Sequence, residues 1–435
     1  MKTYETVRGM RDFLPEDLAK RQRIEDEARH LFRLYGYREV ETPLVESFDL
    51  LSAKAGEEIR HRMYMFKDLG GRRIALRPEM TASVARIVAV KLRSEPKPLR
   101  LGYISNCFRY DNPQMGRYRE FWQAGYELFG SENPEADAEI LAVCHDLLQR
   151  LGLDFSMKLG HVGTLRGILE AEKVKEASQN IIMGLLDKGR FRAALKALRE
   201  LGVSESCLKT VTGLQTLKGF EAEEVLAKGE EATMGNDAAT RSLENLRAVV
   251  TLARSAGVKC PILVDLGFTR GLDYYTGMIF ETFVPQLDIA LGGGGRYDRL
   301  VEVFGGEPTP AVGCSPGIDR IALAMEKHGL FKSLNSQRNT VLIIPVSKTQ
   351  SSNAMALATK LRDANVPALV EISGRGVRDA LSYASGLGFR AVCIIGPREV
   401  ELGKATLKDL ESKVQTEVPF DDVVAAVKNL LTGNS

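Results

Sequence analysis

The hydrophobic pattern changes character along the 435 residues, and this change constrains the fold more than any other feature of the sequence. Short β-like runs dominate residues 1–163, helical periodicity takes over in residues 164–257, and strand signals return in residues 258–331. Residues 340–435 then alternate strand and helix patterns in regular order. The sequence therefore predicts three domains, the first of them assembled from two chain segments on either side of a helical insertion.

The first domain is predicted to be an antiparallel sheet with helices packed on it, an α+β arrangement. Amphipathic spacing predicts helices at Pro15–Tyr35, Met80–Leu92 and Ser315–Lys327. Strands are expected at Arg38–Thr42, Arg73–Leu76, Leu99–Phe108, Phe121–Phe129, Ile262–Leu266, Met278–Phe283 and Leu287–Leu291.

Residues 340–435 are predicted to form a small βαβ domain. The expected strands and helices alternate as Val341–Val346, Ser351–Asp363, Ala368–Ile372, Val377–Leu387, Ala391–Ile395 and Asp421–Leu431. The first turn of this domain, Pro345–Lys348, has no GxGxxG pattern, which argues against a Rossmann domain that binds a dinucleotide.

Composition excludes several classes of protein. The net charge is 59 minus 57, or +2, and 44% of the residues are hydrophobic, so the chain is neither a disordered polyelectrolyte nor a histone-like polycation. No run approaches 18 apolar residues and the first eleven residues lack an apolar core, so neither a membrane span nor a signal peptide is predicted. The six cysteines lie far apart without a CxxC pair, which predicts free buried thiols and no protein-bound zinc. We expect a cytoplasmic protein.

Positive charge is concentrated in one part of the sequence. Residues 60–120 contain 14 Lys or Arg against 5 Asp or Glu, a local charge of +9. A solvated face would explain this excess, but Arg77, Arg109, Arg117 and Arg119 occupy β-like or loop positions close to glycines, where guanidinium groups suit phosphate oxygens. The pattern favours contact with a polyanion or a nucleotide.

The segment from Cys107 to Glu127 reads as strand, turn at Asn112–Gly116, and strand. In such a hairpin Arg109, Gln123 and Glu127 can project from one face, because Gln123 and Glu127 are separated by an even number of residues. The face would then carry a cation, an amide and a carboxylate. The polar outer face of an edge hairpin is the alternative interpretation.

Two further segments suggest a ligand site. Arg270 and two consecutive tyrosines, Tyr274 and Tyr275, lie just before the strand expected at Met278–Phe283. In an extended backbone consecutive side chains face opposite sides, so one tyrosine can line a site while the other packs in the core. Residues 292–295 are four consecutive glycines, along which a ligand can lie against the backbone, although a flexible turn has the same composition. No GxxxxGK[ST] motif is present, so an ATP site would not be a P-loop.

Two candidate residues stand at predicted helix starts. Glu79 and Thr81 follow Pro78, where helix capping by Thr81 is the simpler explanation. Arg320 lies in the first turns of the helix after Gly313–Pro316, where an exposed arginine is usually only solvated.

Taken in order, these motifs resemble histidyl-tRNA synthetase, a class II aminoacyl-tRNA synthetase. The resemblance runs nearly end to end, and Arg-Gly-Leu-Asp-Tyr-Tyr is similar to a signature particular to the histidine enzyme. Its elements are Thr42-Pro43, Arg77-Pro-Glu79, Phe108-Arg109 with Gly116–Phe121, Arg270–Tyr275, Gly293–Asp298 and Gly313–Arg320. The chain differs from the usual family pattern in having Asp111 for Glu, Trp122 for His and Asp319 for Glu.

The resemblance implies that L-histidine and ATP form histidyl-adenylate and pyrophosphate, and that histidine then passes to the 3′-terminal adenosine of tRNA(His). A carboxylate with a pKa near 4 is ionised at pH 7, so its attack requires no general base. Catalysis then depends on positioning and on neutralising phosphate charge, which arginines and the Mg²⁺ carried by ATP can supply.

Residue roles follow from the same resemblance. Arg109 and Arg270 are the expected catalytic residues, holding the α-phosphate and the reacting carboxylate. The expected ATP-binding set is Arg109, Asp111, Arg117, Gly293, Gly294, Gly295 and Arg320, and no protein metal ligand is expected. In the expected histidine-binding set, Glu79, Thr81 and Gln123 bind the α-amino group, and Glu127 and Tyr275 bind the imidazole. Arg270 and Tyr274 complete the set.

Polar recognition of this kind leaves buried groups unpaired when an apolar isostere enters, at about 1–3 kcal/mol each, so no editing domain is required.

The last domain resembles the anticodon-binding domain of the family, with Arg375, Arg378 and Arg390 as candidate RNA contacts. Thr42-Pro43 resembles the dimer-interface motif, which implies a homodimer.

Two alternatives remain open at the level of sequence. The regulatory paralogue of ATP phosphoribosyltransferase senses histidine with the same fold, but it typically lacks the last domain and degrades the signature motifs. A prolyl, glycyl or threonyl enzyme would have a similar last domain, and amino-acid-dependent pyrophosphate exchange separates these from the histidine enzyme.

Overall fold

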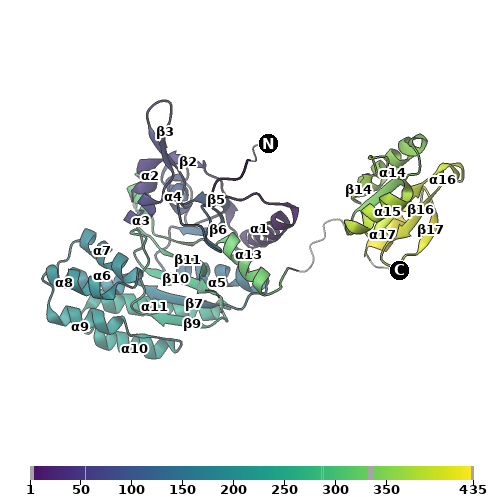
Figure 1. The fold of residues 1–435 in the computed structure, drawn as a ribbon. Coiled ribbons are helices and arrows are strands. Elements are labelled where there is room, and N and C mark those ends of the chain that lie inside the picture. Colours follow the sequence, from purple (N-terminus) through teal and green to yellow (C-terminus); the bar gives the residue numbers. More distant parts are fainter. Residues whose placement is uncertain (1–3, 54, 286, 288, 332–337, 433–435) are drawn as a thin grey trace. The chain divides into compact units, whose positions relative to one another are not determined.

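The computed structural model describes residues 4–53, 55–285, 287, 289–331 and 338–432. The chain divides into two compact units, residues 1–332 and 333–435. Each unit has its own sheet and its own hydrophobic core (Figure 1). Among the described residues, no helix combines the length and apolar character needed to cross a membrane.

The first unit is built on a nine-stranded sheet with the order β1-β5-β6-β12-β11-β10-β7-β9-β8. Its strands are β1 (Arg38–Glu39), β5 (Leu99–Phe108), β6 (Glu120–Phe129), β7 (Ser156–His161), β8 (Lys218–Gly219), β9 (Ile262–Asp265), β10 (Met278–Phe283), β11 (Ala290–Arg296) and β12 (Ala311–Cys314). Neighbours pair antiparallel except β1 with β5 and β7 with β9, which are parallel. The predicted α+β class with a mainly antiparallel sheet is confirmed.

Helices and a small second sheet complete this part of the unit. The helices are α1 (Pro15–Tyr35), α2 (Phe48–Ser52), α3 (Glu57–His61), α4 (Thr81–Val90), α5 (Pro134–Arg150), α12 (Leu300–Val303) and α13 (Ile318–Lys327). The small antiparallel sheet has the order β2-β4-β3, with β2 (Val45–Ser47), β3 (Met65–Lys67) and β4 (Arg73–Leu76). Helix α1 has the predicted bounds, because Pro15 suits the first helical turn and Gly36 ends the helix at φ 73°.

Two predicted strands differ from the structure. The strand expected at Arg38–Thr42 is only two residues long, because β1 pairs with β5 at Arg38 and Glu39 alone. The strand expected at Leu287–Leu291 begins at Ala290 and continues through the glycines to Arg296, while residues 286 and 288 lie outside the described residues. Glycine has low strand propensity, but here β10 and β12 pair with β11 on both sides and hold it extended.

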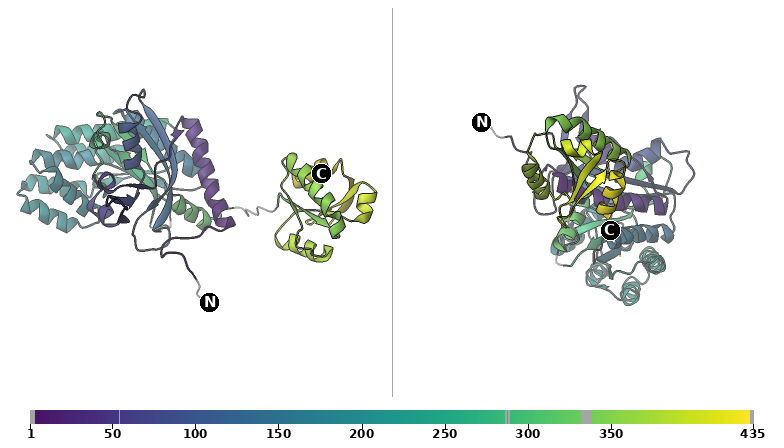
Figure 2. Two further views of the ribbon diagram at one scale, coloured as in Figure 1. Left: turned by 90° about the horizontal axis from the view of Figure 1, so that it is seen from above. Right: turned by 90° about the vertical axis from the view of Figure 1, so that its right-hand side faces the viewer.

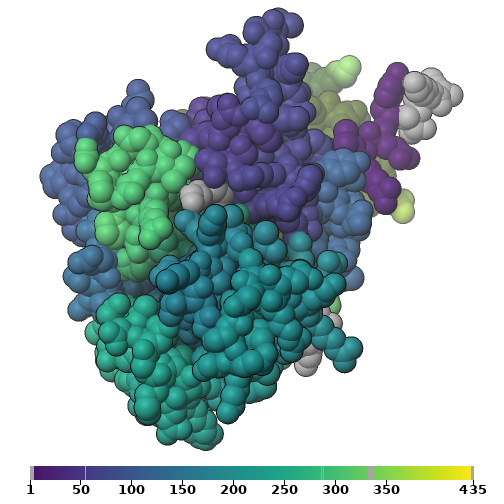
Figure 3. All heavy atoms as spheres, turned by 90° about the vertical axis from the view of Figure 1, so that its left-hand side faces the viewer, coloured from purple at the N-terminus to yellow at the C-terminus, as the bar shows by residue number. Residues whose placement is uncertain are grey.

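Residues 162–255 are almost entirely helical. The helices are α6 (Val162–Ala171), α7 (Glu176–Asp187), α8 (Phe191–Glu200), α9 (Glu205–Leu214), α10 (Ala222–Ala232) and α11 (Asp237–Ser255). The caps at Ser204 and Asn236, whose side chains accept from Cys207 N and Ala239 N, mark where α9 and α11 begin. Helix α11 packs against α5. The insertion helices form a teal lobe next to the purple-blue segment that contains α3, where Lys188 pairs with Glu58 at 3.0 Å (Figure 3).

The second unit has a five-stranded mixed sheet with the order β14-β13-β15-β16-β17. Its strands are β13 (Val341–Pro345), β14 (Ala368–Val370), β15 (Ala391–Ile395), β16 (Lys404–Asp409) and β17 (Gln415–Pro419). Its helices are η1 (Lys348–Gln350), α14 (Ser351–Asp363), α15 (Val377–Gly386), α16 (Pro397–Glu401) and α17 (Val423–Thr432), which lie on both faces of the sheet (Figure 2). The predicted βαβ pattern omitted β16 and β17, because their short sequences are rich in charged residues and Thr and carry little hydrophobic signal.

Candidate active site

A pocket of about 300 Å³ lies on the main sheet, where β6, β11 and β12 meet the loops before β6 and β10. Of the predicted site residues, those lining the pocket are Glu79, Thr81, Arg109, Asp111, Arg117, Gln123, Arg270, Tyr274, Tyr275, Gly293, Gly294 and Arg320. Glu127 and Gly295 lie directly behind this lining. The fold thus collects residues that span more than 240 positions of the chain at one place.

Glu127 lies directly behind one end of the pocket, in contact with the lining residue Thr81. It is 1% exposed, and its carboxyl accepts hydrogen bonds from Thr81 Oγ1, at 2.8 Å, and from the Tyr297 hydroxyl. Gly313 is paired with Glu127 across β6 and β12, and a Cβ atom there would overlap Glu127 Oε2. Burial raises the Glu127 pKa to about 8, although the bonds from Tyr297 and Thr81 oppose the shift. Thr81 therefore contacts Glu127 and does not cap α4.

Glu79 and the two tyrosines form the side wall above Glu127. The Tyr274 hydroxyl donates to Glu79 Oε2 at 2.9 Å, and burial raises the Glu79 pKa against the opposing charges of Arg109 and Arg270. The prediction that one tyrosine would line the site and the other pack away from it is wrong. Tyr274 lies in a turn before β10, so the alternation of a strand does not apply, and both rings line the pocket with their centroids 4.9 Å apart.

Gln123 and Glu127 lie on one face of β6, as their spacing predicts. Gln123 pairs with Ser105 of β5, and its side-chain Oε1 accepts from Cys107 Sγ at 3.4 Å. Arg109 lies just beyond the end of β5, where its Nε donates to Pro78 O at 2.8 Å. The three residues border the same pocket, so the polar face of this hairpin is an interior surface of the site.

The other end of the pocket is lined by guanidinium groups that are held by backbone carbonyls. Arg270 Nη1 approaches Phe280 O at 3.3 Å and Gly294 O at 3.4 Å. Burial works against its charge, but Tyr275 and Glu281 together hold the Arg270 pKa above its ordinary value.

Arg320 donates to Ala290 O at 2.7 Å and to Gly116 O at 3.2 Å. Burial, with the charges of Arg117 and Arg109, lowers the Arg320 pKa to about 10. Arg320 is thus still protonated at neutral pH, and this end of the pocket favours an anion.

Asp111 lies at the edge of the cationic end. Its carboxylate accepts from Arg62 Nη1 at 2.9 Å, and Arg117 Nε lies 3.9 Å away. Arg62 belongs to the segment after α3, far from the predicted motifs, and sequence reasoning missed it. Asp111 therefore enters the pocket already paired on one side.

The glycines of β11 make the pocket wall by having no side chains. A Cβ atom at Gly293 would lie 2.5 Å from Phe280 O and 2.6 Å from Arg270 Nη1, and one at Gly295 would lie 2.6 Å from Met278 O. The segment is a paired strand, so the flexible-turn alternative is wrong. Close approach of the neighbouring strand and of Arg270 requires glycine here.

Two of the four arginines singled out by the charge excess are structural. Arg77 is buried, and it donates to Thr42 O at 2.7 Å and to Asn106 O at 2.9 Å. Arg119 is buried as well, donates to Asp111 O at 3.0 Å, and stacks on Tyr110. A count of charges along a sequence does not separate arginines that hold loops from arginines that face a ligand.

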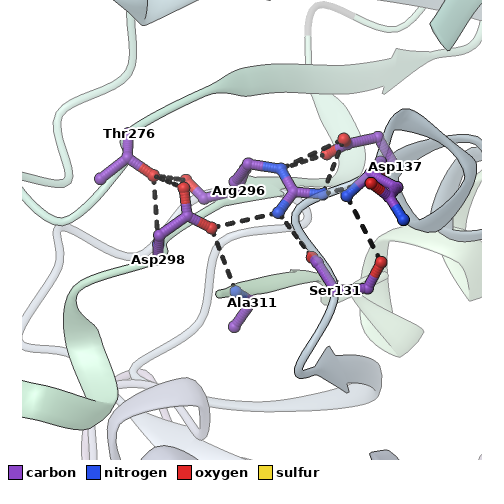
Figure 4. A network of polar contacts seen from close by, with 7 residues as sticks. Ser131, Asp137, Thr276, Arg296, Asp298 and Ala311 are labelled. Atoms are coloured by element: carbon purple, nitrogen blue, oxygen red, sulfur yellow. Dashed lines mark hydrogen bonds and ion pairs between the residues drawn. The ribbon is translucent and has the colours of Figure 1, made fainter. Parts of the chain in front are cut away.

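Arg296, which follows the glycines in β11, is part of a buried polar network (Figure 4). It pairs with Asp137 of α5 at 2.8 Å and with Asp298 at 3.1 Å, and it donates to Ser131 O at 2.8 Å. Burial raises the Asp137 pKa to about 6. The network fastens the end of β11 to the start of α5.

Besides Arg62, sequence reasoning missed other polar residues at the pocket. Tyr297 directly follows Arg296 in the Gly293–Asp298 motif. Only its tertiary contact with Glu127 distinguishes it from an ordinary core tyrosine. Asp187, from insertion helix α7, and Glu58 and Glu281 are scattered over the chain without a local pattern. No group of three or more His, Cys, Asp or Glu within the described ranges is arranged to hold a metal ion, and the expected absence of zinc stays a prediction.

The candidate RNA contacts lie in the second unit. Arg378 is exposed, whereas Arg375 pairs with Glu371 at 2.8 Å and stacks on Tyr383. Arg390 is partly used internally, because its Nε lies 3.5 Å from Glu411 and its Nη1 approaches Leu431 O at 3.4 Å.

Comparison with known families and proteins gives a consistent result. Residues 9–321 match the family model described as histidyl-tRNA synthetase, and residues 340–430 match the model described as anticodon binding domain. A protein from Pyrococcus abyssi named histidine–tRNA ligase is 43% identical over 98% of this chain and 99% of its own. One of the same name from Methanocaldococcus jannaschii is 41% identical over 97% and 98%.

The fold is also similar to solved structures of histidyl-tRNA synthetases. The crystal structure of histidyl-tRNA synthetase from Nostoc sp. PCC 7120 superposes with a TM-score of 0.80 at 23% identity, covering 99% of this chain and all of the other. These similarities include the last unit, which the regulatory paralogue typically lacks, so that alternative is not favoured.

Proposed function

The chain belongs to the histidyl-tRNA synthetase family and is a histidine–tRNA ligase, and from this premise we propose which residues of its pocket carry the reaction. L-Histidine and ATP form histidyl-adenylate and pyrophosphate, and histidine then passes to the 3′-terminal adenosine of tRNA(His). ATP enters with Mg²⁺ as part of the substrate.

In the first step, a carboxylate oxygen of histidine forms a bond to the α-phosphorus while the bond from that phosphorus to the pyrophosphate oxygen breaks. The nucleophile is already ionised, so no proton moves to the protein. Arg109 and Arg270 hold the carboxylate and the α-phosphate, and Arg117 and Arg320 hold the leaving phosphates. In support, backbone carbonyls hold Arg270 and Arg320 at the pocket wall, and prepositioned charge stabilises the transition state without reorganisation.

The rest of the ATP site is formed by Asp111 and the glycine strand. Asp111 binds the adenine, and its pairing with Arg62 sets the position of the carboxylate. Gly293, Gly294 and Gly295 let the nucleotide lie against β11, because the wall there consists of backbone.

The opposite end recognises histidine. Glu79, Thr81 and Gln123 receive the α-amino group, and Glu127 and Tyr275 receive the imidazole nitrogens, with Tyr274 holding Glu79. An amino acid that lacks the ring nitrogens would leave the buried Glu127 without a ligand partner, at a cost of about 1–3 kcal/mol.

The observation that carries this proposal is the division of one pocket into a buried end around Glu127 and an arginine-lined end around Arg270 and Arg320. The test is pyrophosphate exchange with histidine, proline, glycine and threonine in parallel, followed by charging of total tRNA. We expect exchange with histidine alone and charging of tRNA(His). Exchange with proline or glycine in place of histidine would overturn the assignment.

We also propose that the protein works as a cytoplasmic homodimer. Pro43 is followed by Leu44 and Val45, which are partly exposed. Arg86 of α4 pairs with Glu46 at 2.7 Å, and Val90, one turn further along α4, is 60% exposed. These apolar side chains suit a second copy of the chain. Light scattering of the purified protein is expected to give twice the mass of 48.0 kDa, and Val90→Lys is expected to lower that mass.

For the tRNA, we propose that exposed arginines of the second unit contact the anticodon region. Arg378→Ala is expected to raise the KM for tRNA several-fold and to leave histidine-dependent pyrophosphate exchange unchanged. Equal loss in the two assays would contradict the proposed role.

A further inference from the structure

The N-terminal strap, residues 9–13, lies against the loop that carries three of the proposed ATP contacts. That loop, residues 109–119 and named here the arginine loop, joins β5 to β6 and includes Arg109, Asp111 and Arg117. The two segments are about one hundred residues apart in sequence, and no motif of either one predicts the contact.

Gly9 makes the first connection between them. Its carbonyl accepts from Arg119 N at 2.8 Å, at the end of the arginine loop. Gly9 has φ +85°, and a Cβ atom there would lie 2.7 Å from Arg119 Cγ and 3.0 Å from Pro113 Cγ. Both the backbone conformation and the close approach therefore require glycine.

Arg11 makes the second connection, and its side chain contacts two different segments. Its guanidinium lies 3.3 Å from the centroid of the Tyr118 ring, so it stacks on the arginine loop. The same guanidinium forms an ion pair with Asp319 at the start of α13. Asp319 also accepts from Trp122 N of β6 at 2.7 Å, and it directly precedes Arg320.

The strap is anchored away from the loop as well. Phe13 lies under both Arg11 and Arg21, and Arg21 of α1 stacks on Trp122 with 3.9 Å to the ring centroid. Asp319 and Trp122 both line the pocket, so the strap reaches the rim of the ATP site from outside.

The arginine loop is held largely by groups outside its own segment. Within the loop, backbone bonds join Gln114 with Arg117 and Arg109 with Arg119, and the Arg119 side chain donates to Asp111 O. Arg62 and Arg320 contact the loop from the pocket side, and the strap contacts it near Tyr118 and Arg119. Loss of the strap contacts would let this end of the loop shift and displace Arg117 relative to the phosphates.

We propose that the N-terminal strap is a component of the nucleotide site, and that Arg11 is a positioning residue that sets Asp111 and Arg117 for ATP without touching it. This inference rests on the proposed function in one respect, the use of the arginine loop for ATP. In the part of the chain that the structure describes, the strap contacts neither Glu127 nor its partners Thr81 and Tyr297, and the Arg109 side chain is held separately by Pro78 O. Histidine binding is therefore expected to respond much less to the strap than ATP binding.

The test measures the KM for ATP and for histidine in pyrophosphate exchange, together with calorimetric binding of Mg²⁺-ATP. Arg11→Ala is expected to raise the ATP KM and weaken Mg²⁺-ATP binding about 10-fold, with the histidine KM within about 2-fold of wild type. Gly9→Ala is expected to act in the same direction through the backbone.

Arg8→Ala is the matched control, since it removes the same charge from an exposed position next to the strap. It is expected to leave both KM values unchanged. Arg11→Lys keeps a charge opposite Asp319 and loses most of the stacking, so an intermediate effect is expected. It also supplies a folded comparison if the alanine variant unfolds.

A double variant shows the route of the coupling. If Arg11 acts through Asp319, adding Arg11→Ala to Asp319→Asn is expected to cost less than the sum of the two single effects. Unchanged ATP affinity in folded Arg11→Ala and Gly9→Ala, or an equal rise in the histidine KM, would overturn the proposal. Because Mg²⁺-ATP binding is measured without histidine, the strap is tested even if the wild type fails to exchange pyrophosphate with histidine, an outcome that would instead overturn the substrate assignment.

Discussion

The two ends of the pocket are both polar, but they are built differently. At the buried end, Thr81 and Tyr297 donate to Glu127, so side chains satisfy one another in the core. At the open end, Arg270 and Arg320 are held by carbonyls of β10, β11 and adjoining loops, and their charges face the pocket together.

The difference matches two kinds of recognition. A neutral network of fixed donors and acceptors distinguishes ligands by which hydrogen bonds they complete. A group of cations held by backbone favours any anion of suitable shape, and its value lies in stabilising developing charge. Variants at the two ends should therefore separate histidine recognition from ATP use.

The largest effect is expected at Arg270, the arginine of the open end that contacts Tyr275. Arg270 approaches Tyr275 on one side and the glycine strand on the other, so Arg270→Ala removes charge from the reacting atoms. Histidine-dependent pyrophosphate exchange is expected to fall about 1000-fold while circular dichroism and the melting temperature stay close to wild type. Arg72→Ala, at an exposed position, is the control for loss of a guanidinium. Activity comparable to that of the control would contradict the role of Arg270.

The next effect concerns the buried end alone. Glu127→Gln keeps the volume of the side chain but replaces one carboxyl oxygen with an NH₂ group, which donates and does not accept. The glutamine therefore cannot use both of its terminal atoms to accept from Thr81 and Tyr297. The histidine KM is expected to rise about 10- to 100-fold with the ATP KM within about 2-fold. A parallel rise in both constants would mean that the two ends are not separable.

Arg320→Ala makes the complementary change at the open end. We expect the ATP KM to rise about 10-fold and the histidine KM to stay near wild type, because Arg320 faces the phosphate side. Arg320→Lys restores charge but not the paired bonds to Ala290 O and Gly116 O, so partial recovery is expected. Steady-state kinetics with each substrate varied in turn gives both KM values. A rise in the histidine KM as large as the rise in the ATP KM would contradict this role of Arg320.

The smallest effect is on stability and depends on pH. The Glu127 pKa is 4.5 in an unfolded chain and about 8 in the folded one, so the folded state binds the proton more tightly. This contribution is fully present below pH 4.5 and is lost as the pH rises to about 8, so the free energy of unfolding falls over this range. Asp137, with its pKa raised to about 6, changes stability in the same direction. Urea unfolding from pH 5 to 8 is expected to show a steeper decline for wild type than for Glu127→Gln, and equal slopes would exclude a buried neutral Glu127.

Much of the fold was predictable where local signals agree with tertiary contacts. Helix α1 and strands β5 and β10 have the predicted bounds, because helical or strand periodicity there coincides with a buried face. Strands β16 and β17 were missed, since pairing with a neighbour and not hydrophobicity defines them. The glycine strand β11 was misplaced for the same reason.

The site divides along similar lines. Residues in the quoted motifs, from Glu79 to Arg320, could be named in advance and are assembled around one pocket. The roles of Arg77 and Arg119 could not be read from the same sequence, because a buried guanidinium bonded to carbonyls has the same local sequence signal as one that faces a ligand. Arg11 and Tyr297 depend on contacts across 308 and 170 positions of the chain.

The sequence by itself determined the main helices, the helical character of residues 164–257 and the membership of the histidine-specific motif set, because these depend on periodicity and on residue type at short range. Only the tertiary structure decided which polar groups are satisfied within the protein and which are left for a ligand. Hydrogen-bond satisfaction is a property of three-dimensional neighbours, and burial sets the energetic cost of each unsatisfied group.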